Sequence, residues 1–185
     1  RIAETAKTLW LIYASLTLLC AFAYWLAGMS PFDAITHSFS TVSIGGFSTH
    51  DSSMAYFNSP AVNLITVAFL LISACNYALH FNAFSNLDKR NIFVSYFRDP
   101  EFRFFMFIQI ALVTICFFML LSNHHFDGAF KNLEQAAFQS VSISTTAGYT
   151  TSSFDQWPLF LPILLLFASF IGGCAGSTGG GLKVI

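Results

Sequence analysis

The stretch Ser142–Thr151, Ser-Ile-Ser-Thr-Thr-Ala-Gly-Tyr-Thr-Thr, lies between two apolar segments that are typical of membrane proteins. Its small hydroxyl residues and single glycine cannot cross lipid as an isolated strand, because the backbone N–H and C=O groups would have no partners there. Such backbone persists at membrane depth only where protein buries it or where it lines a water-filled cavity. The stretch therefore predicts a loop held inside a membrane protein.

A second copy of this stretch lies about 100 residues earlier, at Ser40–Thr49. The two copies align without gaps, and Gly46 then pairs with Gly148. Each copy follows a short apolar segment, 31–42 or 129–141, that is too short to cross a bilayer. We interpret each segment as a half-helix that dips into the membrane and delivers its loop. The alternative is two Ser/Thr-rich turns in exposed loops, and the recurrence in register argues against it.

Both loops have the composition of a cation filter. The segment Thr145–Tyr149 resembles the filter of potassium channels, in which backbone carbonyls replace the hydration shell of the ion. Glycine permits positive φ, so successive carbonyls can turn to one side. The C-terminal end of each half-helix adds roughly half a negative charge beside the ion. We predict that carbonyls of these residues bind potassium: Ser43, Ile44, Gly45, Gly46, Thr145, Thr146, Ala147 and Gly148. The aromatic residues that follow, Phe47 and Tyr149, are expected to pack outward and hold the diameter of the loops.

The composition indicates lipid as the solvent, because 55% of the residues are apolar, 9% are charged and 23 are Phe. A net charge of −1 gives no basic face for nucleic acid. Uncharged runs at 9–27, 61–79 and 104–121 predict spanning helices, and Trp157-Pro158 opens another span. The predicted fold is an all-α integral membrane protein with repeated units of span, pore half-helix, filter loop and span, as in a potassium-channel-like pore.

The repeat divides the chain into a first unit at 1–86, a cytoplasmic connection at 87–103 and a second unit at 104–185. Lys131 is on the loop side of this arrangement, whereas six basic residues are on the other side: Arg1, Lys7, Lys89, Arg90, Arg98 and Arg103. The positive-inside rule places the filter loops outside and the connection in the cytoplasm. Asp33 and Glu134, near the starts of the half-helices, either attract cations to the mouth or are simply solvated helix starts.

A glycine-rich stretch, Gly172–Gly181, interrupts the last predicted span. Each glycine costs a helix roughly 1 kcal/mol relative to alanine, so this stretch favours irregular backbone that faces the pore or buried protein. We predict a movable gate formed by Gly172, Gly173, Cys174, Ala175, Gly176, Ser177, Thr178, Gly179, Gly180 and Gly181. Tight helix packing through small residues is the main alternative. An intramembrane protease with Ser177 as nucleophile and His80 as base is a rival function, as is a non-transporting membrane assembly subunit.

Three motifs together, Thr41–Ser48, Ser144–Thr151 and Gly172–Lys183, resemble the membrane subunit of bacterial Trk/Ktr-type potassium uptake systems, most closely the TrkH type. The resemblance covers essentially the whole chain. It implies four repeats around one pore, and the present units look like the second repeat and most of the third. Its filter glycines match Gly46 and Gly148, and its gating loop matches Gly172–Gly181.

The same resemblance implies further properties of the complete system. They are the missing repeats of the same polypeptide, a homodimer, a cytosolic nucleotide-binding regulatory subunit, and a location in the bacterial inner membrane. It implies potassium as the transported ion, no cofactor in this chain and no enzymatic activity. Symport of H⁺ or Na⁺ is left open by the residues. Two quarters cannot close a fourfold filter, so no transport is expected from these 185 residues alone.

Overall fold

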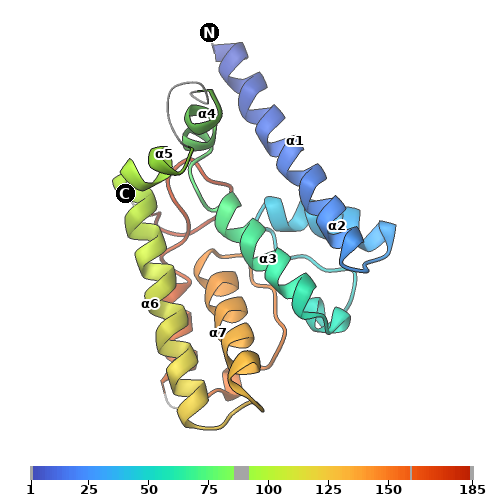
Figure 1. The fold of residues 1–185 in the computed structure, drawn as a ribbon, viewed down its shortest axis with the longest axis vertical. Helices are drawn as coiled ribbons and strands as arrows, with labels where there is room; N and C mark the ends of the chain where they lie inside the picture. The colour runs from blue at the N-terminus through green and yellow to red at the C-terminus, as the bar shows by residue number, and fades with distance from the viewer. Residues whose placement is uncertain (1, 86–91, 159, 184–185) are drawn as a thin grey trace.

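The computed structural model describes residues 2–85, 92–158 and 160–183, and the regular elements of these residues are all helices. Two of them, α1 (Ile2–Leu26) and α6 (Pro100–Ser122), are long and apolar enough to cross a membrane. They fall on two of the predicted spans. Arg1, Lys89 and Arg90, which contribute to the charge argument, lie outside the described residues. The helices stand side by side as a bundle, with α1 and α6 on its flanks (Figure 1).

The two half-helices are α2 (Pro31–Val42) and α7 (Ala129–Ser144). At 1.5 Å per residue they are about 18 and 24 Å long, short of the ~30 Å hydrocarbon core of a bilayer. Ser30 caps α2 by accepting a hydrogen bond from the backbone of Asp33, and Pro31 occupies the first helical position. α2 packs on α1 and α7 packs on α6, so the unit of long helix and half-helix occurs twice.

The predicted span at 61–79 is not one straight helix. α3 (Pro60–Ser73) and α4 (Tyr77–Ser85) meet at an angle of 91°. The side-chain oxygen of Asn76 accepts a hydrogen bond from the backbone N–H of Ala78 (2.8 Å), which starts the new helix direction. Part of the predicted hydrophilic connection is also helical, since α5 (Ile92–Arg98) precedes α6.

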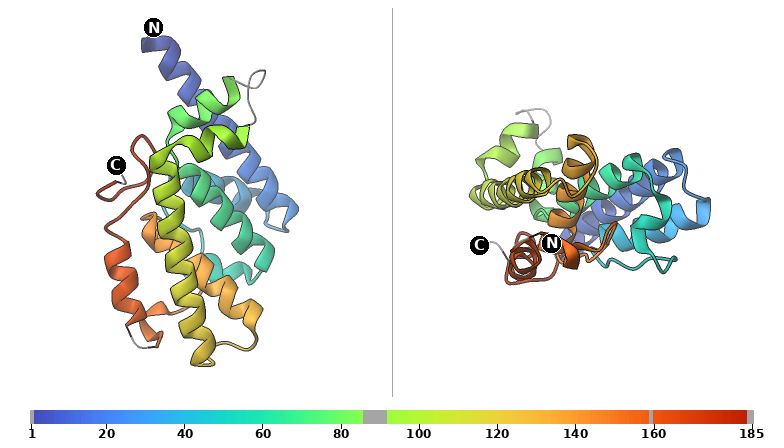
Figure 2. Two further views of the ribbon diagram at one scale, coloured as in Figure 1. Left: turned by 60° about the vertical axis from the view of Figure 1, so that its left-hand side comes forward. Right: turned by 90° about the horizontal axis from the view of Figure 1, so that it is seen from below.

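The last predicted span is shorter than the sequence indicated. A 3₁₀ turn follows each loop: η1 (Ser53–Phe57) precedes α3, and η2 (Phe154–Gln156) precedes α8 (Leu161–Ala168). The helix α8 has only eight residues. The chain then continues as irregular backbone that contains the glycine-rich stretch. Figure 2 shows α8 and this segment beside the yellow-green α6, with the segment extending from α8 toward the end that holds α4 and α5.

A buried hydroxyl network fixes the positions of the helices that surround the first loop. Tyr24 of α1 is fully buried, and its hydroxyl pairs with those of Thr41 of α2 (2.8 Å) and Thr66 of α3 (2.9 Å). The hydroxyl of Tyr149 reaches the same Thr41 at 3.3 Å. Four segments that are distant in sequence are thereby joined at one point just behind the loops.

Candidate ion filter and gate

The two predicted filter loops are in direct contact. A Cβ atom placed on Gly46 would lie 1.8 Å from the carbonyl oxygen of Ala147 and 3.5 Å from the carbonyl carbon of Gly148. Only glycine permits so close an approach of two backbones. The structure therefore brings together Gly46 and Gly148, which are about 100 residues apart in sequence.

The loops also share their backbone conformation in register. Ser43 and Thr145 end the half-helices with φ of −77° and −80°. The next residues, Ile44 and Thr146, have φ of 55° and 71°, and Gly46 and Gly148 follow with φ of 69° and 83°. Positive φ is unfavourable for a β-branched side chain such as Ile or Thr. The same unfavourable conformation at paired positions shows that the two loops are structural repeats.

Each half-helix points its C-terminal end at its loop. The cap of α2 is Ser43 and the cap of α7 is Thr145, the first residues of the predicted ion-binding sets. The aligned peptide dipoles of a helix place roughly half a negative charge at such an end. The two negative helix ends thus converge where the two loops meet, and this place favours a cation.

The aromatic residues that follow the glycines differ from each other in their surroundings. Tyr149 is fully buried, with its hydroxyl near the Thr41 hydroxyl and at 3.4 Å from the Phe47 carbonyl oxygen. It packs against the first unit, between the loops and the helices behind them. The Phe47 side chain is 81% exposed. Tyr149 thus packs behind the loops, whereas Phe47 is largely exposed within these 185 residues, so outward packing of both aromatic residues stays a prediction.

The two acidic residues near the half-helix starts are engaged in hydrogen bonds. The Asp33 carboxylate, 13% exposed, accepts from the hydroxyls of Ser30 and Thr49, both at 2.7 Å, and contacts His50 at 3.2 Å. Burial raises the pKa of Asp33, but these hydrogen bonds and the nearby His50 outweigh it and hold the pKa below its usual value. Asp33 therefore ties the end of the first loop to the start of α2.

Glu134 has a corresponding structural role between the two units. Its carboxylate is 8% exposed, accepts a hydrogen bond from the Asn63 amide of α3 at 2.7 Å and pairs with Lys131 at 3.0 Å. Neither acid is a simple solvated helix start, although both still place negative charge on the loop side of the bundle.

The glycine-rich stretch lies against the ends of both half-helices. Gly180 donates its N–H to the Thr146 hydroxyl at 2.8 Å, and the Thr178 hydroxyl donates to the Val42 carbonyl at 2.8 Å. A Cβ on Gly179 would lie 3.1 Å from the Thr145 carbonyl oxygen. The stretch thus covers the side of the filter loops that faces α4 and α5.

The bend between α3 and α4 forms the other wall that holds this stretch. Cys174 donates its N–H to the Ala74 carbonyl at 2.8 Å, and Tyr77 donates its N–H to the Gly176 carbonyl at 3.2 Å. A Cβ on Gly173 would lie 2.8 Å from the Ala74 carbonyl oxygen. The sequence did not indicate this cradle, because a run of apolar residues does not reveal where it bends.

Two charged side chains also contact the glycine-rich stretch. Glu101, in the first turn of α6, accepts a hydrogen bond from the Ala175 N–H. Lys183 donates to the Gly179 carbonyl and, at 3.2 Å, to the Ser177 hydroxyl. The ammonium group therefore lies within the fold of the glycine-rich stretch.

The geometry does not support the protease alternative. The ring nitrogens of His80 contact the Tyr96 hydroxyl at 2.6 Å and the Ile72 carbonyl at 3.0 Å, so neither is directed at Ser177. The Ser177 hydroxyl contacts Lys183 instead. Among the described residues there is also no group of three or more His, Cys, Asp and Glu that could hold a metal ion.

Two units of long helix, half-helix and inward loop, with loops that meet and share an unusual backbone, define a multi-pass membrane protein of the pore-forming transporter class. The family model described as TrkH, cation transport protein, matches residues 1–185. The chain belongs to this family.

Named relatives agree with this assignment. The chain is 65% identical over 185 residues to the Trk system potassium uptake protein TrkH of Vibrio parahaemolyticus and 61% identical to that of Escherichia coli, matching 100% of this chain and 38% of each relative. It is 40% identical to the Escherichia coli TrkG protein over 99% of the chain. These relatives are named as transporters and not as enzymes.

A solved structure confirms the fold. The crystal structure of the potassium transporter TrkH from Vibrio parahaemolyticus matches with a TM-score of 0.94 and 65% identity, covering 100% of this chain and 39% of that one. The chain therefore spans about two fifths of the length of the relatives that it matches.

Proposed function

We propose that this chain supplies two of the carbonyl-lined segments of a potassium uptake pore in the bacterial inner membrane. The ion would be held by main-chain oxygens of 43–46 and 145–148. The observation that carries the proposal is the contact between Gly46 and Ala147, in loops that share positive φ at paired positions. Carbonyl rings of this kind can replace the hydration shell of an alkali cation.

The contact between the loops is head to tail, which supports a closed ring. The carbonyl of Ala147 lies against Gly46, while a Cβ on Gly148 would have nothing within 4 Å. Repeating the same step would place a further loop against Gly148, and it would place Phe47 behind the loop of a preceding repeat, as Tyr149 lies behind the loop of the first unit. A head-to-tail contact of this sort closes into a ring when the rotation permits it. We propose that the remaining loops come from other repeats of the same polypeptide.

We further propose that Gly172–Gly181 gates this pore. The stretch contacts both half-helix ends through Gly180 and Thr178, so a conducting ion would have to pass it. It is anchored by individual backbone hydrogen bonds and not by a continuous helix. Irregular backbone of this type can rearrange at lower cost than a spanning helix.

Orientation and partners follow from charge and from family membership. Figure 1 shows α5 and the starts of α1 and α6 at one end of the bundle and the start of α7 at the other. The described basic residues Lys7, Arg98 and Arg103 belong to the first group of segments and Lys131 to α7, which supports filter loops on the outside under the positive-inside rule. A homodimer and a cytosolic nucleotide-binding regulatory subunit complete the proposed system. Coupling to H⁺ or Na⁺ is a separate property that these residues do not decide.

The filter assignment is tested with two matched glycine substitutions in a full-length polypeptide that contains this chain. Gly148 and Gly128 have φ of 83° and 82°, and neither has an atom within 4 Å of an added Cβ. Gly148→Ala and Gly128→Ala therefore carry the same backbone strain and differ in whether the site is in the filter. We expect Gly148→Ala to lower potassium uptake and K⁺/Na⁺ preference at least tenfold, and Gly128→Ala to leave the preference unchanged. Measurements of Rb⁺ and Na⁺ flux in liposomes check this.

Two outcomes of that experiment would reject the proposal. Unchanged ion preference in Gly148→Ala would remove Gly148 from the filter. The absence of any flux in the well-folded unsubstituted protein would favour the non-transporting assembly subunit.

A further inference from the structure

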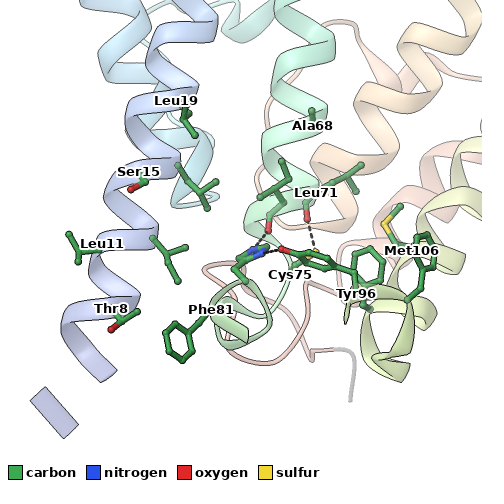
Figure 3. A pocket seen from close by; sticks show the side chains of 16 residues that line it. Thr8, Leu11, Ser15, Leu19, Ala68, Leu71, Cys75, Phe81, Tyr96 and Met106 are labelled. Carbon is green, nitrogen blue, oxygen red and sulfur yellow. Dashed lines mark hydrogen bonds between the residues drawn. The ribbon is translucent and has the colours of Figure 1, made fainter. Parts of the chain in front are cut away.

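A deep groove runs along the outside of the bundle between α1 and α3. Residues of α4, α5 and the start of α6 line one end of it, and its volume is about 950 Å³. Figure 3 shows side chains from the five helices around one space, including Leu11 and Leu19 of α1, Leu71 of α3, Phe81 of α4 and Met106 of α6. None of the predicted filter residues lines this groove, so it is separate from the proposed ion path.

The polar groups at the end of the groove near α4 and α5 are already paired. His80 contacts the Tyr96 hydroxyl at 2.6 Å and the Ile72 carbonyl at 3.0 Å, and the Cys75 thiol donates to the Leu71 carbonyl at 3.2 Å. A polar occupant would therefore find few free partners and would lose its own hydration. The walls suit hydrocarbon.

The length of the groove matches one leaflet of a bilayer. Its lining on α1 extends from Thr8 to Leu19, which at 1.5 Å per residue is about 16 Å. Half of the ~30 Å hydrocarbon core of a bilayer is about 15 Å. An acyl chain of the leaflet nearest α4 and α5 would extend along this length.

Positive charge surrounds the end of the groove near α4 and α5. Lys7, Arg98 and Arg103 are exposed, and each is next in sequence to a residue that lines the groove. The nearby Asp99 accepts a hydrogen bond from a backbone N–H at the start of α6, and Glu101 accepts one from the glycine-rich stretch. None of the three cations forms an ion pair with another described residue, so they can contact an anion at the membrane surface and favour anionic lipid there.

We propose that this groove binds an acyl chain of an anionic phospholipid, with the headgroup phosphate near Lys7, Arg98 and Arg103. Three features together favour this occupant: the length of the groove, its paired polar groups and the positive charge at its end near α4 and α5. Because the chain spans 38% of its relatives, a further protein segment is the competing occupant. The proposal is independent of the filter and of the gate.

The headgroup contact is tested by native mass spectrometry of the full-length polypeptide with phosphatidylglycerol or phosphatidylcholine. We expect the unsubstituted protein to retain phosphatidylglycerol in preference to phosphatidylcholine. Lys7→Gln combined with Arg98→Gln should weaken phosphatidylglycerol binding about tenfold or more. Lys131→Gln, which removes a positive charge at the opposite end, should leave it unchanged. Equal retention of the two lipids, or no effect of the double substitution, would overturn the headgroup contact.

The groove itself is tested with a bulky side chain. Ala68 is exposed on α3 and lines the groove, so Ala68→Phe should displace the chain and lower the amount of retained lipid at least fivefold. Leu18 of α1 is 72% exposed and does not line it, so Leu18→Phe serves as the control. Ser15→Leu offers a second, smaller obstruction if Ala68→Phe does not fold. Unchanged lipid in a folded groove variant, or a protein segment in the groove of the complete assembly, would overturn the proposal.

Discussion

At the scale of single residues, hydroxyl groups buried behind the loops decide how the two units meet. Tyr24 joins α1 to α2 and α3 through Thr41 and Thr66, and Tyr149 of the second loop reaches the same Thr41. These four residues are buried, so their hydroxyls bond each other and nearby backbone carbonyls instead of water. The position of the second loop against the first thus depends on a few side chains of the first unit.

Removal of the Tyr24 hydroxyl tests this network. Tyr24→Phe leaves Thr41 and Thr66 each without one buried partner, which should lower stability by about 1–3 kcal/mol. Tyr56→Phe is the control, because the Tyr56 side chain is 58% exposed. Thermal unfolding of the purified full-length protein in detergent checks the difference. Equal apparent Tm values for the two variants would show that the network contributes little.

The sequence predicted the residues of the loops better than their surroundings. Glycines at 46 and 148 were expected to adopt positive φ, and they do. Positive φ at Ile44 and Thr146 was not expected, since isolated β-branched residues avoid it. Tyr149 was expected to pack outward, but its partners in the first unit were not predicted, because a side chain that packs across two units depends on contacts with residues about 100 positions away.

At the scale of helices, glycine content marked where the last span ends, but hydropathy did not reveal the bend at 74–76. The half-helix α2 was predictable in its bounds, because Ser30-Pro31 is a strong start signal and the glycine loop is a strong stop. The 91° turn between α3 and α4 has no such signal, since Ala74 and Cys75 are compatible with a helix. At the bend, the Ala74 carbonyl and the Tyr77 N–H form hydrogen bonds with the glycine-rich stretch, and these contacts could not be read from the sequence.

The cradle at the bend gives a prediction for gating. Gly173→Ala would place a Cβ about 2.8 Å from the Ala74 carbonyl oxygen, so the stretch could no longer dock there. We expect a several-fold higher basal Rb⁺ flux in liposomes, because the undocked stretch would obstruct the pore less. Ser177→Ala, in the same stretch but without a backbone clash, is the control and should be nearly silent.

Two outcomes would reject this prediction. A flux change in Ser177→Ala as large as that in Gly173→Ala would show that the clash at Ala74 is not the cause. A flux in Gly173→Ala no higher than in the unsubstituted protein would show that docking at Ala74 does not restrain the stretch.

At the scale of the whole molecule, the two units are joined by polar contacts as well as by apolar packing. The Asn63 amide on α3 donates to Glu134 on α7, and Glu134 also pairs with Lys131. A repeat architecture of this kind was visible in the sequence, because both units keep the same order of elements. Which side chains connect the units was not visible, since it depends on how the units rotate against each other.

Loss of this polar contact should weaken the interface between the units. Glu134→Ala leaves the buried Asn63 amide without its partner, at a cost of about 1–3 kcal/mol. Asp127→Ala removes the same charge from an exposed turn and should cost much less. Urea or thermal unfolding of the two variants in the full-length protein provides the comparison. If Asp127→Ala is as destabilising as Glu134→Ala, loss of the Asn63 contact is not the cause.

The central claim is that main-chain oxygens of the two loops share one dehydrated alkali cation with the remaining loops of the pore. A structure of the complete assembly soaked with Rb⁺, with anomalous scattering recorded, tests it most directly. We expect Rb⁺ on the common axis, within direct coordination distance of carbonyls from both 43–46 and 145–148. Rb⁺ bound only away from these carbonyls, or loops that surround no common ion, would contradict the account.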